Sequence, residues 1–381
     1  MTTVVISPTN VAGFPDGGGH FWVYMQYVEG LRRAGCRVCW LEEYRPPADA
    51  VAGDRVLAIF RARMARHGLG GSAILYTRPA RDDADPVYID VDAAEAERIL
   101  ARADLLLNFH YAIHPALLAR FQRTALVDID PGLLQHWMAT GVLTPAPHDA
   151  YFTTGPTVGT PEARFLGAGV RWTTIRPPVA LDRWPYVFAP RSQRFTTVST
   201  WWGDEWVTDA SGVYENNKRV SFLAFVGLPR QTTQPLELAL YLGRGDEEDR
   251  RRLEANGWRV RHSREVAATP GAYARYIRSS RGEFSCVKPS CLKFRNAWMS
   301  DRSVCYLASG KPVVVQDTGQ AEFLPTGEGM FTFTTQEEAA AALAAVNADY
   351  QRHCRAARLI AEDHFDARRT AETILMEVSG R

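Results

Sequence analysis

Residues 282–319, GEFSCVKPSCLKFRNAWMSDRSVCYLASGKPVVVQDTG, contain the local pattern that decides the fold. A strand-forming run over 283–287 leads into a long polar loop, and apolar residues at helical spacing follow over 301–309. Gly310 is placed to end the helix, and the apolar run over 312–315 predicts a buried strand. A strand, a helix and a buried strand in this order predict a parallel βαβ unit.

The same alternation extends over both halves of the chain. Helical patterns lie between the expected strands, which implies parallel sheets that are covered on both faces. We therefore expect an α/β protein with two Rossmann-like halves. The expected strands cover residues 3–7, 37–41, 105–109, 124–129, 150–154, 173–175, 195–200, 236–242, 258–261, 283–287 and 312–315. The expected helices cover residues 20–34, 93–102, 115–123, 246–256, 271–279, 301–309, 336–350 and 356–378.

A proline-rich stretch separates the two halves. Residues 176–190, RPPVALDRWPYVFAP, carry prolines at a density that predicts an extended connection. We therefore expect an N-terminal domain over residues 1–178, a linker over 179–194 and a second domain over 195–355. The remaining residues, 356–381, are expected to form a helix that packs back on the first domain.

The composition indicates a globular protein and argues against several other classes. The 381 residues suffice for two domains, and 44 basic against 43 acidic side chains leave a formal net charge of +1. This balance argues against disorder and against a nucleic-acid-binding surface. No apolar run is long enough to cross a bilayer, and the first residues lack the pattern of a signal peptide. We expect a cytoplasmic protein without an integral membrane segment.

Six scattered cysteines fit a reducing compartment better than a disulfide framework. Cys36 and Cys39 have the spacing of a redox or zinc motif, but they fall within an expected strand, where the two positions point to opposite faces. No second pair completes a zinc site. We therefore interpret both as core residues and expect no metal site.

A glycine-rich turn follows the first expected strand. Residues 14–20, FPDGGGH, lie where ligands bind in a doubly wound sheet, and Gly18 and Gly19 allow a ligand to approach the backbone closely. The turn is not the GxGxxG fingerprint of dinucleotide sites, so the sequence gives NAD little support. The alternative interpretation is a plain flexible turn.

His20 begins the helix after this turn and is the candidate general base of the site. An imidazole titrates near neutral pH, and a carboxylate at Asp128 or Asp130 would orient its second ring nitrogen. The structural alternative is that His20 caps the helix and that the aspartates form a turn. His110, which follows the expected strand over 105–109, is a further cleft candidate, and Trp137 is a candidate for the wall of an acceptor pocket.

A basic cluster in residues 282–319 suits an anion. Lys288, Lys293 and Arg302 lie around the expected helix start, where free N–H groups favour negative charge. Ser300 and Asp301 are the expected caps of that helix. Lysine is scarce, with four among 44 basic residues, so a retained ammonium is a candidate for a phosphate contact. The alternatives are a solvated basic loop and chance survival of the lysines.

The sequence from Leu307 to Gly319 resembles the donor-site segment of GT-B glycosyltransferases, where a helix, a Gly-Lys-Pro turn, an apolar strand and DTG hold a nucleotide sugar. The chain is similar to that family in layout too, with a proline-rich linker near Pro177. The resemblance implies two domains facing across a cleft, with the donor on the second domain and the acceptor on the first. Lys218 is similar to the lysine that meets donor phosphate in the retaining branch. The donor-site residues that follow are Lys218, Lys288, Lys293, Asp301, Arg302, Ser303, Asp317, Thr318 and Gly319.

In the natural-product and plant glycosyltransferases of this fold, a histidine after the first strand is the base, and the resemblance assigns this role to His20, oriented by Asp128 or Asp130. The sequence departs from the family in two places. Cys305 stands where many members place a ribose-binding glutamate, and the EGFG-like turn is missing. Asp301, one turn earlier on the same helix face, is the nearest carboxylate that substitutes. Retention and inversion of stereochemistry both stay open.

The resemblance implies a metal-independent glycosyltransferase of hexosyltransferase type. We expect it to move a sugar from a nucleoside diphosphate sugar to a hydroxyl of a small natural-product or lipid-like acceptor. No cofactor beyond this co-substrate and no nucleic-acid partner is expected. The alternatives are a nucleotide-sugar epimerase on the same fold and a catalytically silent sugar-nucleotide-binding or scaffold protein.

Overall fold

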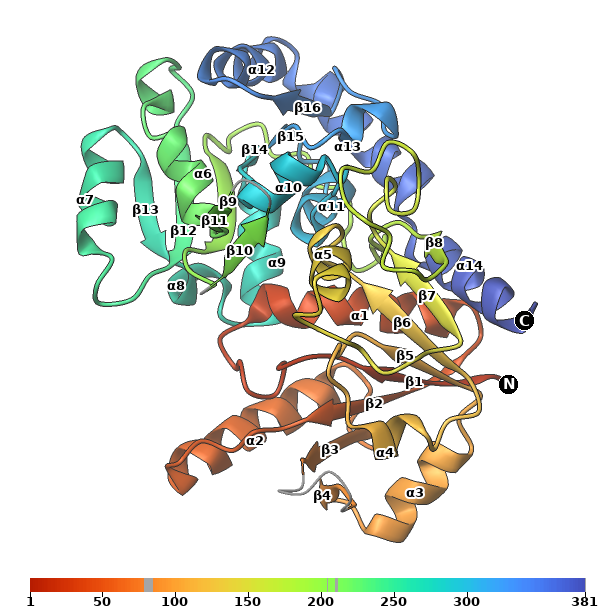
Figure 1. Cartoon of the computed structure of the whole chain (residues 1–381). Coiled ribbons are helices and arrows are strands. Elements are labelled where there is room, and N and C mark those ends of the chain that lie inside the picture. The colour runs from red at the N-terminus through yellow and green to blue at the C-terminus, as the bar shows by residue number, and fades with distance from the viewer. Residues whose placement is uncertain (79–84, 204, 210–211, 381) are drawn as a thin grey trace.

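The chain folds into two α/β domains, each built on a largely parallel sheet (Figure 1). The computed structural model describes residues 1–78, 85–203, 205–209 and 212–380. The first sheet has the strand order β4-β3-β2-β1-β5-β6-β7-β8, in which β4 runs antiparallel to β3 and the other neighbours are parallel. Its strands are β1 (Thr3–Ser7), β2 (Arg37–Glu43), β3 (Ala73–Thr77), β4 (Val87–Ile89), β5 (Leu105–Asn108), β6 (Thr124–Asp128), β7 (Ala150–Thr153) and β8 (Trp172–Thr174).

The second sheet has the strand order β13-β12-β9-β14-β15-β16, and its neighbours are parallel. In each sheet the strand order reverses beside the first strand, between β1 and β5 and between β9 and β14. Ligands bind at the carboxyl ends of the strands at such switch points. The strands are β9 (Phe195–Thr200), β12 (Leu236–Tyr241), β13 (Arg259–His262), β14 (Gly282–Ser285), β15 (Val313–Gln316) and β16 (Met330–Phe333), and a separate hairpin consists of β10 (Trp206–Asp209) and β11 (Gly212–Glu215).

Helices cover the two sheets, which confirms the predicted α/β class with two Rossmann-like domains. None of the described helices is long and apolar enough to cross a membrane. The helices are α1 (Gly18–Arg33), α2 (Ala50–Arg66), α3 (Ala93–Ala101), α4 (Pro115–Leu118), α5 (Leu133–Ala139), α6 (Lys218–Ala224), α7 (Glu247–Ala255), α8 (Ser263–Ala267), α9 (Pro270–Ser279), α10 (Pro289–Phe294), α11 (Asp301–Ala308), α12 (Gln336–Ala348), α13 (Tyr350–His364) and α14 (Ala367–Ser379), with short 3-10 turns η1 (Leu228–Arg230) and η2 (Gln320–Glu322).

The C-terminal segment returns to the first domain, as predicted, but only with its last helix: α13 packs on α11 of the second domain, and α14 packs on α1. The helix α13 ends just before Phe365, which is fully buried. After this break the chain continues as α14 along α1 (Figure 1). A Cβ on Gly30 of α1 would lie 2.2 Å from the Ala367 carbonyl oxygen, so glycine is what allows α1 and α14 to approach this closely. Val179 of the linker pairs with Asp366 at the break.

Some other elements differ from the sequence expectations. The expected helix over 115–123 ends at Leu118, and α2 was not expected, because few of its apolar side chains are buried and Val51 is 77% exposed. Cys36 and Cys39 are buried in different core clusters, one with Phe21 and the other with Val5. This confirms their interpretation as core residues, although Cys36 lies one residue before β2 and only Cys39 lies within the strand.

Candidate functional site between the domains

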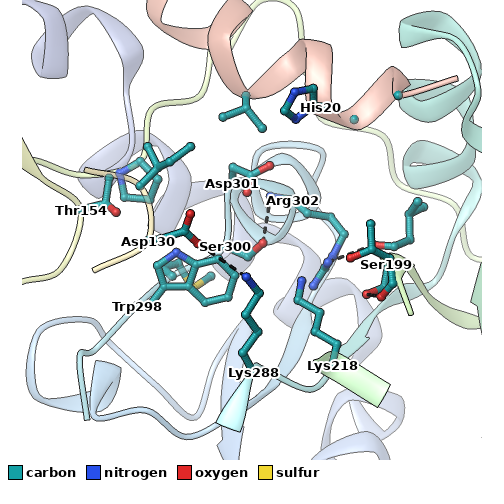
Figure 2. A pocket seen from close by; sticks show the side chains of 18 of the residues that line it. His20, Asp130, Thr154, Ser199, Lys218, Lys288, Trp298, Ser300, Asp301 and Arg302 are labelled. Carbon is teal, nitrogen blue, oxygen red and sulfur yellow. Dashed lines mark hydrogen bonds and ion pairs between the residues drawn. The ribbon is translucent and has the colours of Figure 1, made fainter. Parts of the chain in front are cut away.

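A cavity of about 320 Å³ lies between the two domains, at the carboxyl ends of their central strands. Figure 2 shows His20 of α1 on one side and Lys218 and Lys288 on the other, with Asp301 between them. The walls also include Ser199 at the end of β9 and Thr154 after β7. The cavity therefore occupies the place where a doubly wound fold binds its ligands.

The glycines at the start of α1 bring the two domains together. A Cβ on Gly18 would lie 2.4 Å from the carbonyl oxygens of Ala267 and Thr269, and a Cβ on Gly19 would lie 2.7 Å from the Tyr273 ring. These three residues belong to the second domain, at α8, the α8–α9 junction and α9. Both glycines line the cavity, but the close approach that they allow is to the facing domain.

His20 lines the cavity as a neutral imidazole. Its Nε2 lies 2.7 Å from the backbone oxygen of Thr9, and because a carbonyl oxygen only accepts, Nε2 carries the proton and Nδ1 keeps its lone pair. Burial lowers the pKa of His20, against the raising effects of the Thr9 carbonyl and the Asp301 carboxylate. The ring is thus held in the tautomer in which Nδ1 accepts a proton.

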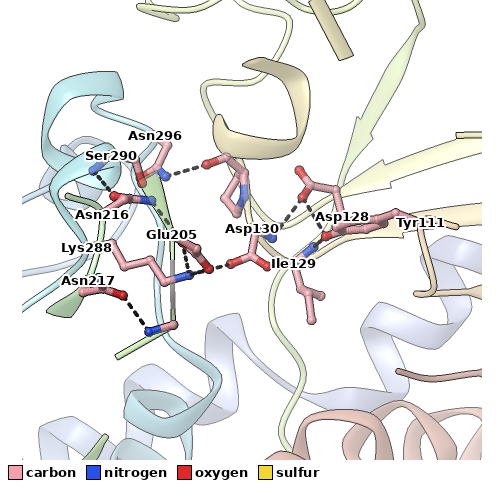
Figure 3. Close-up of polar contacts among 12 residues, drawn as sticks. Tyr111, Asp128, Ile129, Asp130, Glu205, Asn216, Asn217, Lys288, Ser290 and Asn296 are labelled. Atoms are coloured by element: carbon pink, nitrogen blue, oxygen red, sulfur yellow. Dashed lines mark hydrogen bonds and ion pairs between the residues drawn. The ribbon is translucent and has the colours of Figure 1, made fainter. Parts of the chain in front are cut away.

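The aspartates expected to orient His20 are engaged elsewhere. Asp128 is fully buried and accepts hydrogen bonds from Gln135 at 2.8 Å and from Thr153 at 2.7 Å. Burial raises its pKa to about 6. Asp130 faces Lys288 at 3.9 Å (Figure 3). Across the described ranges, neither carboxylate bonds to His20, so the Thr9 carbonyl takes the orienting place that the sequence suggested for an aspartate.

Lys218 places a cation in the cavity at the first turn of α6. Burial, together with the positive charges of Arg302 and Lys288, lowers the pKa of Lys218 to about 8. Its Nζ lies 5.6 Å from the centre of the Trp298 ring, and no described side chain forms an ion pair with it. A partly buried ammonium in this state is stabilised by an anionic ligand.

Lys288 has the opposite environment. Its Nζ lies 2.7 and 2.8 Å from the two carboxylate oxygens of Glu205, and 3.9 Å from Asp130 across the domain boundary (Figure 3). Burial lowers the pKa of Lys288, but the Asp130 and Glu205 carboxylates outweigh burial and raise it. The same boundary is crossed by a hydrogen bond of 2.7 Å from Asn296 to the backbone oxygen of Pro131. Lys288 is thus already neutralised by protein carboxylates.

The start of α11 forms the floor of the cavity. The Ser300 hydroxyl caps the helix by accepting from the Arg302 backbone N–H at 3.2 Å. The Asp301 carboxylate lines the cavity, and burial raises its pKa despite the nearby cations Arg302 and Lys218. Arg302 pairs with the buried Glu283 at 2.5 Å, which holds its guanidinium against the sheet. Arg302 therefore contributes positive charge from a fixed position.

Several residues predicted for the donor site lie outside the described cavity lining. Lys293 pairs with Asp209 at 2.9 Å on the hairpin side. Ser303 is buried on α11, and Thr318 bonds within its own turn to Gln320. The turn formed by Asp317, Thr318 and Gly319 instead supports the loop before α11, because the Thr318 carbonyl accepts from the Ala297 N–H at 2.8 Å and Asp317 accepts from the Gly319 N–H at 2.8 Å.

Two residues predicted for the acceptor side also lie outside the lining. Burial lowers the pKa of His110, and the charges of Glu43 and Arg78 also act on it. Neither of these two residues lines the cavity. Trp137 packs in an apolar cluster with Leu133, Val207 and Phe294. Strand ends bring side chains to one edge of a sheet, but the sequence does not say which of them face the cavity.

The sequence interpretation missed Thr9, Glu205 and Tyr241. Tyr241 ends β12 and lines the cavity, so its place at the end of an expected strand was a usable signal. Thr9 acts through its backbone, and Glu205 comes from the segment that leads into the hairpin, so neither carries a sequence signal. In the part of the chain that the structure describes, no group of three or more His, Cys, Asp and Glu side chains is arranged to hold a metal ion.

Comparisons with known proteins show likeness in structure alone. No family model and no curated protein matches the chain. An alpha-glucosyltransferase solved with UDP-glucose and DNA containing an abasic site is 10% identical, covers 99% of both chains and has a TM-score of 0.61. The pneumococcal O-GlcNAc transferase GtfA, solved with UDP and GlcNAc, is 9% identical over 100% of this chain and 99% of its own, with a TM-score of 0.59. A glycosyltransferase from Rickettsia africae is 9% identical over 100% and 98%, with a TM-score of 0.55.

Proposed function

Starting from the GT-B fold that this chain shares with those glycosyltransferases, we propose that it transfers a sugar from a nucleoside diphosphate sugar to a hydroxyl of a small acceptor. The observation that carries the proposal is Lys218. A cation without a carboxylate partner among the described residues, and with a pKa lowered to about 8, lies in the interdomain cavity. Such a group is suited to an anionic ligand, because removing an unpaired charge from water costs free energy.

The donor diphosphate lies near Lys218 in this proposal. The N-termini of α1 and α11 both reach the cavity, and α1 has no side-chain cap at Gly17, so its first N–H groups are available to phosphate oxygens. The Asp301 carboxylate accepts a hydrogen bond from a ribose hydroxyl. It thereby replaces the glutamate that many family members carry at the position of Cys305. The Cys305 sulfur is buried and accepts from Gln26 at 3.4 Å, away from any such role.

His20 acts as the general base in the transfer step. The acceptor hydroxyl gives its proton to Nδ1 of His20, and its oxygen forms a bond to the anomeric carbon of the sugar. The bond from that carbon to the diphosphate oxygen breaks, and the electron pair leaves with the diphosphate. Lys218 supplies positive charge to the leaving group, which supports a transfer of a hexosyl group without a metal ion.

The experiment is calorimetric binding of UDP to wild-type protein, Lys218→Met and Lys293→Met. Loss of a charge-assisted contact should weaken UDP binding to the Lys218 variant by about 1.5–3 kcal/mol. Lys293→Met removes the same charge outside the cavity and should bind UDP as the wild type does. Equal affinity in all three proteins would refute the donor assignment.

A catalytically silent binder is the second candidate, favoured by the buried Cys305 at the place of a ribose-binding glutamate. Slow hydrolysis of a UDP-sugar panel without acceptor separates the two, because an enzyme releases free sugar and a silent binder does not. A nucleotide-sugar epimerase would instead return an altered donor.

The cysteines are all unpaired, which supports placement in the reducing cytoplasm.

A further inference from the structure

The loop between β1 and α1, residues 8–17, carries the group that orients His20. The Thr9 carbonyl of this loop lies 2.7 Å from Nε2 of His20, and Phe14 of the same loop lines the cavity. Thr9 is attached to the sheet by a long hydrogen bond of 3.3 Å from its hydroxyl to the Phe109 carbonyl. The position of the Thr9 carbonyl therefore depends on what holds the rest of the loop.

Glu42, near the end of β2, holds the middle of this loop. Its Oε1 accepts a hydrogen bond of 2.7 Å from the Ala12 N–H, and its Oε2 accepts one of 2.9 Å from the Trp40 indole. In the part of the chain that the structure describes, the backbone of residues 10–13 makes hydrogen bonds to Glu42 alone. The Glu42 carboxylate is thus the polar anchor of the loop.

A carboxylate is a costly anchor in this place. Glu42 is fully buried, and removing a charge from water costs free energy. Burial raises the pKa of Glu42 to about 7, and the backbone of Ala12 and Val11 and the Trp40 indole oppose this rise. An apolar side chain of the same length would avoid the cost, and an amide would accept at one atom only. What the carboxylate adds is an acceptor for the loop and for Trp40 at the same time.

The state of the His20 ring depends on this loop more than on its other neighbours. Asp301 of α11 raises the pKa of His20, and Arg63 of α2 lowers it, but both act through their charge. Tyr24 of α1 packs against the ring edge to face, with the ring centres 5.3 Å apart. Among the described residues, the Thr9 carbonyl is the one hydrogen-bond partner of the ring. It therefore decides which ring nitrogen carries the proton.

We propose that Glu42 is a positioning residue of the site, which holds the Thr9 carbonyl at Nε2 of His20 through Ala12 and the loop. The inference rests on the proposed function, in which Nδ1 of His20 accepts the proton of the acceptor hydroxyl. Without the anchor the Thr9 carbonyl moves away, and part of the His20 population carries its proton on Nδ1, where it can no longer act as the base. Glu42 lies outside the cavity lining, so it acts through His20 and not on a ligand.

The first test observes the His20 ring directly and needs no turnover. Glu42→Met removes both acceptor oxygens, and Glu43→Met is the matched control, because Glu43 is the next carboxylate of β2 and pairs with Arg45 and Arg78 instead. Nitrogen NMR of protein with labelled histidine reports the two tautomers, and His20→Gln assigns the signal. The ratio of Nδ1–H to Nε2–H should rise about five- to tenfold in Glu42→Met and stay at the wild-type value in Glu43→Met.

An unchanged ratio in a folded Glu42→Met protein overturns the inference. Glu42→Asp gives the same comparison if the methionine variant does not fold, because it keeps the charge and withdraws both oxygens from the loop by one methylene group. The ratio should rise in this variant too, and an unchanged ratio overturns the inference in the same way.

The second test asks whether Glu42 acts through His20. Hydrolysis is followed with the UDP-sugar that the wild type hydrolyses fastest. Glu42→Met should lower kcat about 10–100-fold with UDP affinity within about twofold, and should change kcat by less than about twofold in a His20→Ala background. Equal factors in both backgrounds mean that Glu42 supports the fold alone, which overturns the positioning role. A protein that hydrolyses no UDP-sugar contradicts the proposed enzymatic function, whereas the tautomer ratio still decides what Glu42 does to His20.

Discussion

The two walls of the cavity are built on the same kind of sheet but differ in charge. The second domain contributes the cations Lys218, Lys288 and Arg302, together with the N-terminus of α11. The first domain contributes the neutral His20, apolar side chains of α1, and the carboxylates Asp16 and Asp130. Both walls are built on the same kind of fold, so the division into a wall with cations and a wall without them comes from the side chains that each sheet places at the cavity.

The two cavity lysines make the same point within one wall. Lys218 has no carboxylate partner among the described residues and a lowered pKa, whereas Lys288 is bonded to Glu205 and has a raised pKa. The sequence gives both the same prediction, because both are rare lysines near the ends of strands. Under the proposed function, this difference means that Lys218 can meet an anionic ligand directly, whereas Lys288 first has to give up a protein carboxylate.

The largest expected effect concerns the first-domain wall. His20→Ala should lower turnover by about 10²–10⁴-fold with little change in UDP affinity, because a general base acts in the transition state and not in donor binding. The acidic limb of the kcat/KM profile should vanish in the variant. In the wild type that limb should lie below the usual histidine pKa of about 6.5, since burial lowers the pKa of His20.

The control is His110→Ala, which removes a histidine outside the cavity lining and should keep both turnover and the pH profile. Near-normal turnover in a folded His20→Ala protein would mean that the first-domain wall has no acid–base role.

The next effect tests whether the two walls depend on glycine to approach each other. Gly18→Ala should lower the free energy of unfolding by about 1–3 kcal/mol, because its Cβ would lie 2.4 Å from two backbone oxygens of the second domain. Urea denaturation measures the change, and Gly71→Ala is the control, since a Cβ there meets nothing within 4 Å. Equal stability of the two variants would show that the domains separate without cost at this contact.

A third prediction uses the lowered pKa of Lys218. A bound diphosphate stabilises the ammonium and raises this pKa, so UDP affinity should be full below pH 8 and should fall as the pH rises above it. Calorimetry in buffers of different ionisation enthalpy should detect proton uptake on binding at pH 8.5. Lys218→Met should show neither the fall nor the uptake; persistence of both in this variant would assign the titration to another group.

The smallest effect distinguishes Lys288 from Lys218. Glu205→Gln removes the carboxylate at 2.7 Å from Lys288 and should tighten UDP binding about two- to fivefold, because the ammonium then becomes available to the diphosphate. Glu254→Gln, in the surface pair with Arg250, is the control and should change nothing. Weaker UDP binding after Glu205→Gln would indicate that the Lys288–Glu205 pair holds the site together.

The sequence predicted the fold better than the site. The sequence located the central strands of both sheets within a few residues, because a short apolar run between turn residues is a local property, and these strands are buried on both faces. The placement of His20 and of Asp301 in the cavity also followed, since both lie at helix starts beside central strands. His110 and Lys293 share these local features and lie outside the lining, because a strand end or helix start has several sides.

The sequence by itself determined the α/β class with two Rossmann-like domains and a scarce set of lysines, both of which depend on the order and chemistry of neighbouring residues. Only the tertiary structure decided which charges meet. The partner of Lys288 is Glu205, 83 residues away, and the group that orients His20 is the Thr9 carbonyl, which has no side-chain signature. The physical reason is that a pKa, and with it a chemical role, depends on burial and on contacts between segments, which local sequence patterns do not encode.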